Sequence, residues 1–175
     1  MEPAEASIRE FLTRARLNTY LAPEASMIRV KCFSVFAYSE DADGPFYTDM
    51  YYASDDDRTL RGVETVLSNE MQVHLRISYT GGFEAVVGLP LSAKDIFNRI
   101  LLPCRTAALA DRRLFHEGVL QGFPYRYEWQ QSANTECETI SISTGGSWSV
   151  VHKITFVEET PLGASGDGDA FHAKQ

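Results

Sequence analysis

Residues 44–83 read GPFYTDMYYASDDDRTLRGVETVLSNEMQVHLRISYTGGF, and this stretch decides the fold. It consists of runs rich in Tyr, Val, Ile and Thr, which are separated by clusters of Ser, Asn, Asp and Gly. Such runs are typical of strands, and such clusters are typical of the turns between them. We therefore predict strands at about residues 45–53, 60–67 and 70–80.

A pattern of the same kind returns between residues 122 and 157. The strands that it predicts lie at about 124–131, 136–143 and 148–158. An alternating segment at about 27–38 predicts a further strand before the opening stretch. Residues 104–121 are ambiguous, with a helix to about residue 110 and then a short strand at 114–116 as one interpretation.

Two helices are marked by the residues at which they begin. Ser7 and Glu10 form a capping box, in which the serine accepts from the first turn and the glutamate reaches back to the cap. Ser92 and Asp95 have the same arrangement. Apolar residues follow each box at helical spacing, so we predict one helix near each serine.

The order of helix and strands occurs twice, which predicts an internal duplication over about residues 7–83 and 92–157. The two helices read SIREFLTRARL and SAKDIFNRILL, and the strands that follow open with GPFY and GFPY. The second match aligns Tyr47 with Tyr125. The alternative is that any α+β protein can contain two similar helices.

These elements predict an α+β fold, in which two helices pack on a strongly curved, largely antiparallel sheet that is barrel-like around aromatic side chains. A chain of 175 residues suits one core, so we expect a single domain over residues 1–160. Residues 161–175, rich in Gly, Ala, Ser and Asp, are predicted to form a flexible tail.

The charge balance disfavours two classes of partner. The chain has 24 acidic and 16 basic residues, giving a net charge of -8. An acidic surface repels nucleic-acid phosphates and anionic lipid, so we expect neither nucleic acid nor membrane as a partner. No run approaches the ~18 apolar residues of a membrane helix, and the acidic N-terminus does not resemble a signal peptide. A cytoplasmic location is therefore expected.

The cysteines and the absent motifs indicate no metal and no cofactor. Cys32, Cys104 and Cys137 are odd in number and lack metal-ligand spacing, which is typical of buried thiols in a reducing compartment. No phosphate-binding or dinucleotide-binding motif is present. His74 and His152 occupy similar places in the two halves, but the strand alternation puts them on opposite faces, so we predict no metal pair.

Asp49 stands on a strand face that should be buried, between Tyr47 and Tyr51. The corresponding face of the later strand is aromatic throughout: Tyr125, Tyr127 and Trp129. His152 likewise stands in an apolar row with Val150 and Ile154. A buried carboxylate or imidazole costs several kcal/mol unless it is paired, so both residues call for an explanation.

These residues predict an aromatic-lined pocket for a small hydrophobic or aromatic molecule, with Tyr47, Tyr51, Tyr125, Tyr127 and Trp129 as ligand-binding residues. Asp49 is expected to act as a general base or to orient His152 for that task, in cofactor-independent cyclase or isomerase chemistry. Three alternatives remain. Asp49 could bond a neighbouring tyrosine hydroxyl, His152 could be a satisfied core residue, or the strand could turn Phe46 and Thr48 inward instead.

A second function of a different class is an acidic protein-interaction module, such as an immunity or regulatory protein without catalysis. Its work would be done by exposed faces such as the one carrying Asp55, Asp56 and Asp57. An enclosed pocket favours the first function, and a filled core with an exposed patch favours the second.

The chain resembles an uncharacterised bacterial family, a domain of unknown function sometimes fused behind helix-turn-helix regulators. Two motifs carry the resemblance: a helix of the form F-L-x-x-A-x-x-x-T-Y from Phe11 to Tyr20, and a strand Y-x-D-x-Y from Tyr47 to Tyr51. The resemblance covers about residues 7–157 and weakens in the middle strand. It implies no known activity, although fusion to regulators would imply ligand sensing.

Overall fold

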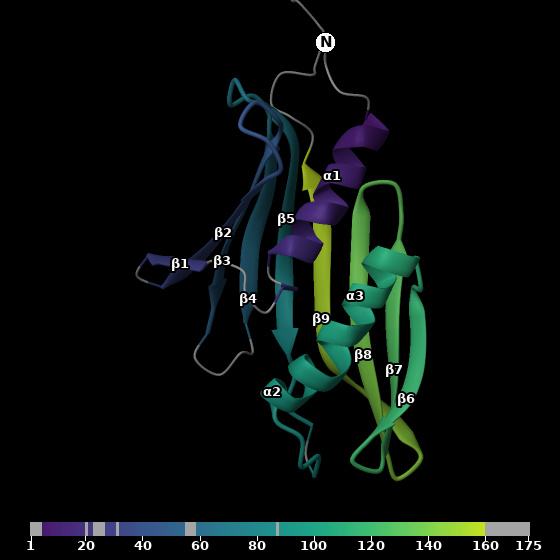
Figure 1. Cartoon of the computed structure of the whole chain (residues 1–175). Helices are drawn as coiled ribbons and strands as arrows, with labels where there is room; N and C mark the ends of the chain where they lie inside the picture. Colours follow the sequence, from purple (N-terminus) through teal and green to yellow (C-terminus); the bar gives the residue numbers. More distant parts are fainter. Residues whose placement is uncertain are drawn as a thin grey trace, which may run out of the picture.

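The computed structural model describes residues 5–19, 21–22, 27–30, 32–54, 59–86 and 88–159. Within them, nine strands form one antiparallel sheet in the order β1-β2-β3-β4-β5-β9-β8-β7-β6 (Figure 1). The strands of the first half are β1 (Met27–Val30), β2 (Phe33–Ser39), β3 (Phe46–Ala53), β4 (Leu60–Leu67) and β5 (Val73–Phe83). Those of the second half are β6 (Phe115–Leu120), β7 (Phe123–Gln131), β8 (Thr135–Thr144) and β9 (Ser147–Glu159).

The α+β class and the antiparallel sheet are confirmed, but the sheet is open. The strands β1 and β6 lie at its two edges and do not pair with each other. The barrel-like closure expected from the sequence is therefore wrong. The segment predicted as one strand at about 27–38 is a hairpin, because the chain turns back at Cys32 and β1 pairs with β2.

The middle of the sheet is formed by β5 and β9, which are antiparallel neighbours. Figure 1 shows the yellow strand β9 between teal β5 and green β8, so the last strand of the described chain joins the two halves. Tyr79 pairs with Phe156 at this junction. The two halves of the sequence therefore lie on the two sides of one strand pair.

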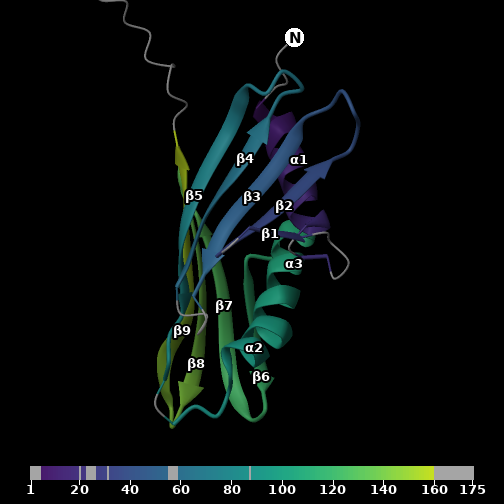
Figure 2. The same ribbon diagram turned by 90° about the vertical axis from the view of Figure 1, so that its left-hand side faces the viewer.

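The helices lie on one face of the sheet (Figure 2). They are α1 (Glu5–Asn18), α2 (Ala93–Ile96), the π-helical turn η1 (Phe97–Leu101) and α3 (Leu102–Asp111). The capping box at Ser92 and Asp95 is present, since each side chain bonds the other's backbone N–H. The first helix begins at Glu5, two residues before the predicted cap.

The second helix continues through Pro103, at the point where its hydrogen-bond pattern changes. Leu102 N–H donates to the carbonyl of Phe97, five residues back, which is the bond of a π turn. Proline has no N–H to donate, and a wider turn accommodates such a gap without ending the helix. The helix ends at Arg112, whose left-handed backbone (φ 55°) terminates it.

Two groups of buried side chains form the core. One lies under α1, against β3, β4, β5 and the later part of β9, and the other lies under α2 and α3, against β7, β8 and the earlier part of β9. They meet where the ring of Trp129 stacks on that of Phe156, with centroids 6.0 Å apart and an interplanar angle of 3°. The core is thus continuous across the β5–β9 junction.

A β-bulge in β9 changes which residues face the helices. Ile140 pairs with His152, whereas the next residue of β8, Ser141, pairs with Val150, so Val151 is the extra residue. Val151 and His152 are both buried, while Val150 is 38% exposed. The predicted apolar row containing Val150 is therefore wrong at that residue, because a bulge reverses the alternation. His74 lies on the face opposite to His152, as the alternation of β5 predicted.

Candidate functional site

An arginine, a glutamate and a tyrosine form a buried cluster in the first half of the chain. Arg16 of α1 donates to both carboxylate oxygens of Glu64 on β4, and its Nη2 lies 2.5 Å from Oε2. The hydroxyl of Tyr47 on β3 donates to the same carboxylate over 3.0 Å. All three side chains are buried. The Glu64 carboxylate is bonded by both Arg16 and Tyr47, so the cluster connects α1 to strands β3 and β4.

The second half contains the same three residue types in the same arrangement. Arg105 of α3 donates to both oxygens of Glu138 on β8, and its Nε lies 2.9 Å from Oε1. The hydroxyl of Tyr127 on β7 donates to Oε1 over 2.9 Å. Burial would raise the pKa of Glu138, but the Arg105 guanidinium and the His152 imidazole together outweigh it and lower that pKa to about 2. Glu138 is therefore ionised at neutral pH.

Neither ion pair was predicted from the sequence, although signals for them exist. Each arginine follows a buried leucine by one helical turn, Arg16 after Leu12 and Arg105 after Leu101. Glu64 alternates with Val66 on the inward face of β4. A basic residue in an apolar stripe and an acidic one on an apolar strand face would together have indicated a pair.

Asp49 is buried as predicted, with 2% of its surface exposed. It accepts a hydrogen bond of 2.7 Å from the hydroxyl of Tyr79, and it lies opposite Glu64 in the β3–β4 register. Burial, together with the neighbouring Glu64 carboxylate, raises the pKa of Asp49 to about 8. Its carboxyl group is therefore mostly protonated at neutral pH, bonded to a tyrosine as one of the sequence alternatives had it.

The structure does not bring Asp49 and His152 together. In register, Asp49 aligns across β4 and β5 with Glu158, six positions from His152 along β9 (158 − 152 = 6). No hydrogen bond or ion pair joins the two side chains, because Asp49 bonds Tyr79 instead. The role predicted for Asp49 in orienting the imidazole therefore stays a prediction.

His152 is 1% exposed and lacks hydrogen bonds at both ring nitrogens. Its Nε2 lies 3.7 Å from Oε2 of Glu138, which is longer than a hydrogen bond, and its ring lies 4.5 Å from that of Phe83. Burial lowers the pKa of His152 more strongly than the nearby Glu138 carboxylate and the backbone of Gly82 raise it. The imidazole is therefore neutral at neutral pH, with one N–H donor and one bare nitrogen.

A cleft of about 700 Å³ opens beside His152. Strands β1 to β4 contribute one side of it, α2 and η1 contribute the other, and the end of β5 and the middle of β9 lie between them. Its lining includes Tyr51, Phe83, Phe97, Arg105, His152 and Ile154. The π turn supplies residues to this wall, and such turns are frequent at functional sites.

Of the predicted ligand-binding residues, Tyr51 lines this cleft and the others do not. Tyr47, Tyr127 and Trp129 are buried in the core, and Tyr125 packs against it while half-buried. The aromatic faces thus fill the interior instead of enclosing a ligand there. Among the described residues, the buried side-chain nitrogens without a hydrogen bond are Trp129 Nε1 and the two of His152, and only His152 lines the cleft.

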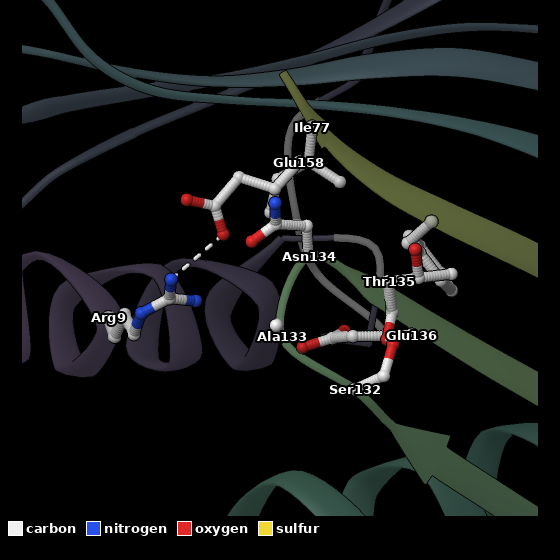
Figure 3. A pocket seen from close by; sticks show the side chains of 9 residues that line it. Arg9, Ile77, Ser132, Ala133, Asn134, Thr135, Glu136 and Glu158 are labelled. Atoms are coloured by element: carbon white, nitrogen blue, oxygen red, sulfur yellow. Dashed lines mark hydrogen bonds and ion pairs between the residues drawn. The ribbon is translucent and has the colours of Figure 1, made fainter. Parts of the chain in front are cut away.

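Two smaller cavities lie near α1. One holds about 20 Å³, room for one water, and Figure 3 shows Arg9 of α1 reaching over it towards Glu158 of β9, 2.8 Å away. The other is a groove of about 540 Å³ between α1 and α3, lined by Arg16 and Arg112 among others. None of the described residues that line these two cavities has a buried side-chain nitrogen or oxygen without a hydrogen bond, so the cleft at His152 is the candidate site.

In the part of the chain that the structure describes, no three His, Cys, Asp or Glu side chains gather as metal ligands would. No described helix is both long enough and apolar enough to span a membrane. No family model matches the chain, and no curated protein or solved structure matches it either. The resemblance to a bacterial family therefore stays an expectation.

Proposed function

We propose that the protein binds a small molecule in the cleft beside His152. The observation that carries the proposal is the imidazole of His152, which is buried at the cleft with neither nitrogen hydrogen-bonded. Buried polar groups nearly always have a hydrogen-bond partner, and a buried group that lacks one lowers the stability of the protein by about 1–3 kcal/mol. A ligand that supplies the missing partner would recover that free energy on binding.

The size and lining of the cleft support the same proposal. Sites for small molecules usually have volumes of roughly 300–1,000 Å³ and combine apolar walls with a few polar groups. The cleft lies within that range and has aromatic walls at Phe83 and Phe97. His152 would then fix the orientation of the ligand, because it offers one donor and one acceptor at a defined place.

Chemistry at this site would depend on His152 acting without Asp49. A neutral imidazole is the base form, and its lowered pKa keeps it in that form at neutral pH. We propose, as an extension, that His152 could remove a proton from a bound molecule, as a cofactor-independent isomerase or cyclase requires.

The alternative function, an acidic interaction module, has less support. Residues 55–57, the acidic run expected to act in it, lie outside the described residues. The filled aromatic core does not separate the two functions, because an interaction module would also have one. The open cleft of about 700 Å³ beside His152 favours small-molecule binding.

The test is the substitution His152→Leu. Leucine is chosen because Leu75 stands at the corresponding position of the first half. Because it removes two unpaired nitrogens, we expect the melting temperature to stay the same or to rise by a few degrees. In a thermal-shift screen of small aromatic compounds, we expect the hits of the wild type to lose most of their effect on this variant.

The matched control is His74→Leu, on the opposite face of the sheet, which should leave every hit unchanged. If the hits stabilise His152→Leu as strongly as the wild type, they do not bind at the imidazole and the proposed site is wrong.

We also propose that the two halves of the chain descend from a duplication. The support is the pair of Arg–Glu–Tyr clusters, because matching buried ion pairs are an uncommon coincidence. In these clusters Tyr47 corresponds to Tyr127, not to Tyr125 as the GPFY and GFPY strand openings suggested.

A further inference from the structure

We propose that the ligand of the cleft is an organic anion with an aromatic or aliphatic body, such as an aryl or medium-chain carboxylate. This inference rests on the proposed function, since it concerns the same cleft. It depends on the charge and polarity of the lining, which differ from those of the rest of the protein.

The first observation is the sign of the charge. Of the described lining residues, Arg29, Lys94 and Arg105 carry a positive charge and none is an aspartate or a glutamate. The chain as a whole has a net charge of -8. A described lining that has cations and no carboxylates, in an acidic protein, favours a negatively charged ligand, which the rest of the surface would repel.

The second observation is which of these charges can meet a ligand. Arg105 is engaged by Glu138, so its charge is largely balanced inside the protein. Arg29 on β1 and Lys94 on α2 are exposed, and neither is ion-paired with a described residue. They belong to opposite sides of the cleft, so an anionic group between them would be attracted by both.

The third observation is the apolar surface between the charges and the imidazole. Phe33 and Phe97 line the cleft and are 42% and 37% exposed. Exposed aromatic rings in a concave site provide apolar area that a ligand can cover. The anionic group would therefore lie near Arg29 and Lys94, the apolar body along the rings, and a polar atom against His152.

The test uses two fluorescent probes that share one aromatic body. These are 8-anilinonaphthalene-1-sulfonate, an anion, and N-phenyl-1-naphthylamine, its neutral counterpart. We expect the wild type to bind the anion at least tenfold more tightly in fluorescence titrations at low ionic strength. Raising the salt concentration should reduce that preference, because the two cations are exposed to solvent.

Charge reversal locates the effect. Arg29→Glu and Lys94→Glu should each weaken binding of the anionic probe about fivefold to tenfold and change the neutral probe less than twofold. The matched control is Lys153→Glu, which alters the net charge equally but lies on the outer face of β9, and it should change neither probe.

The outcomes separate the two proposals. If both probes bind equally and the reversals have no effect, while His152→Leu weakens both, the ligand is not an anion but the cleft remains the site. If His152→Leu changes neither probe, or the wild type binds neither at millimolar concentration, the proposed function fails and the inference fails with it.

Discussion

The buried carboxylates differ in what balances their charge. Glu138 is held ionised by Arg105, whereas Asp49 has a tyrosine hydroxyl and remains protonated. A buried ion pair contributes little to stability by itself, but removing one partner leaves the other charge uncompensated. Substitutions at the Arg105–Glu138 pair and at Asp49 should therefore change stability in different ways.

We predict that Arg105→Met lowers the free energy of unfolding by about 3–5 kcal/mol, because Glu138 is then buried without its cation. The double variant Arg105→Met, Glu138→Gln should lose less than the sum of the single losses, since the amide still accepts from Tyr127. Urea denaturation of the three variants measures the difference.

The control for this prediction is the exposed pair of Arg14 and Glu40, where Arg14→Met should cost less than about 1 kcal/mol. Additive losses at Arg105 and Glu138 would contradict a coupled buried pair.

Asp49 predicts a specific dependence of stability on pH. Its pKa rises from 3.8 to about 8 on folding, so the folded state holds the proton more tightly. The resulting stabilisation is complete below about pH 4 and is lost as the pH rises through about 8. Between these limits its contribution falls by up to about 1.4 kcal/mol per pH unit.

Asp49→Asn keeps an acceptor for Tyr79 and cannot ionise, so its stability should fall less steeply from pH 5 to pH 9 than that of the wild type. Equilibrium unfolding at several pH values gives both curves. Parallel curves would mean that Asp49 is ionised in the folded protein.

At the residue scale, the sequence predicted the buried positions of Asp49 and His152, because a strand face can be read from its alternation. It could not predict which residues lie beside them on the neighbouring strands, since that depends on the order of strands across the sheet. The partners of Glu64 and Glu138 were missed because they come from helices distant in the chain.

At the scale of single elements, two glycines allow tyrosine rings to lie against the sheet. A Cβ at Gly62 of β4 would lie 2.3 Å from the ring of Tyr79, and one at Gly118 of β6 would lie 2.6 Å from Tyr125. Tyr79 is buried and holds Asp49, whereas Tyr125 is only half-buried. The two rings therefore differ in their freedom to move aside.

We predict that Gly62→Ala lowers the free energy of unfolding by about 3 kcal/mol and Gly118→Ala by about 1 kcal/mol. The added methyl group is tolerated less where the neighbouring ring is buried and cannot move aside. Thermal and urea unfolding of the two variants provide the comparison. Equal costs would mean that the ring of Tyr79 can be displaced as easily as that of Tyr125.

The element boundaries were largely predictable, while their irregularities were not. Strand composition and turn residues place β3, β4, β7 and β8 within a few residues. Pro103 marks the place of the π turn, but the sequence pattern indicated a helix end there and not a wider turn. The bulge at Val151 changes the pairing of β9 with β8, and alternation within one strand does not describe it.

At the scale of the whole molecule, the stacked rings of Trp129 and Phe156 connect the two parts of the core. We therefore predict that the chain unfolds as one domain. Urea transitions followed by tryptophan fluorescence and by far-ultraviolet circular dichroism should coincide. Two separated transitions would instead indicate that the halves unfold independently.

The sequence predicted the number of helices and an antiparallel sheet, but not its openness. Closure depends on whether the edge strands meet, and β1 and β6 are both short strands at distant ends of the order. Local sequence patterns predict which segments are strands. The order of the strands depends on contacts between segments far apart in the chain, which these patterns do not describe.

The central place of β9 has a consequence for how the protein is made. A ribosome releases β5 long before β9, so the growing chain carries β5 with one side of its backbone unpaired. The two halves can join only when the last strand of the described chain emerges. Until then, this unpaired side is where a nascent chain would be captured by a chaperone or by another copy.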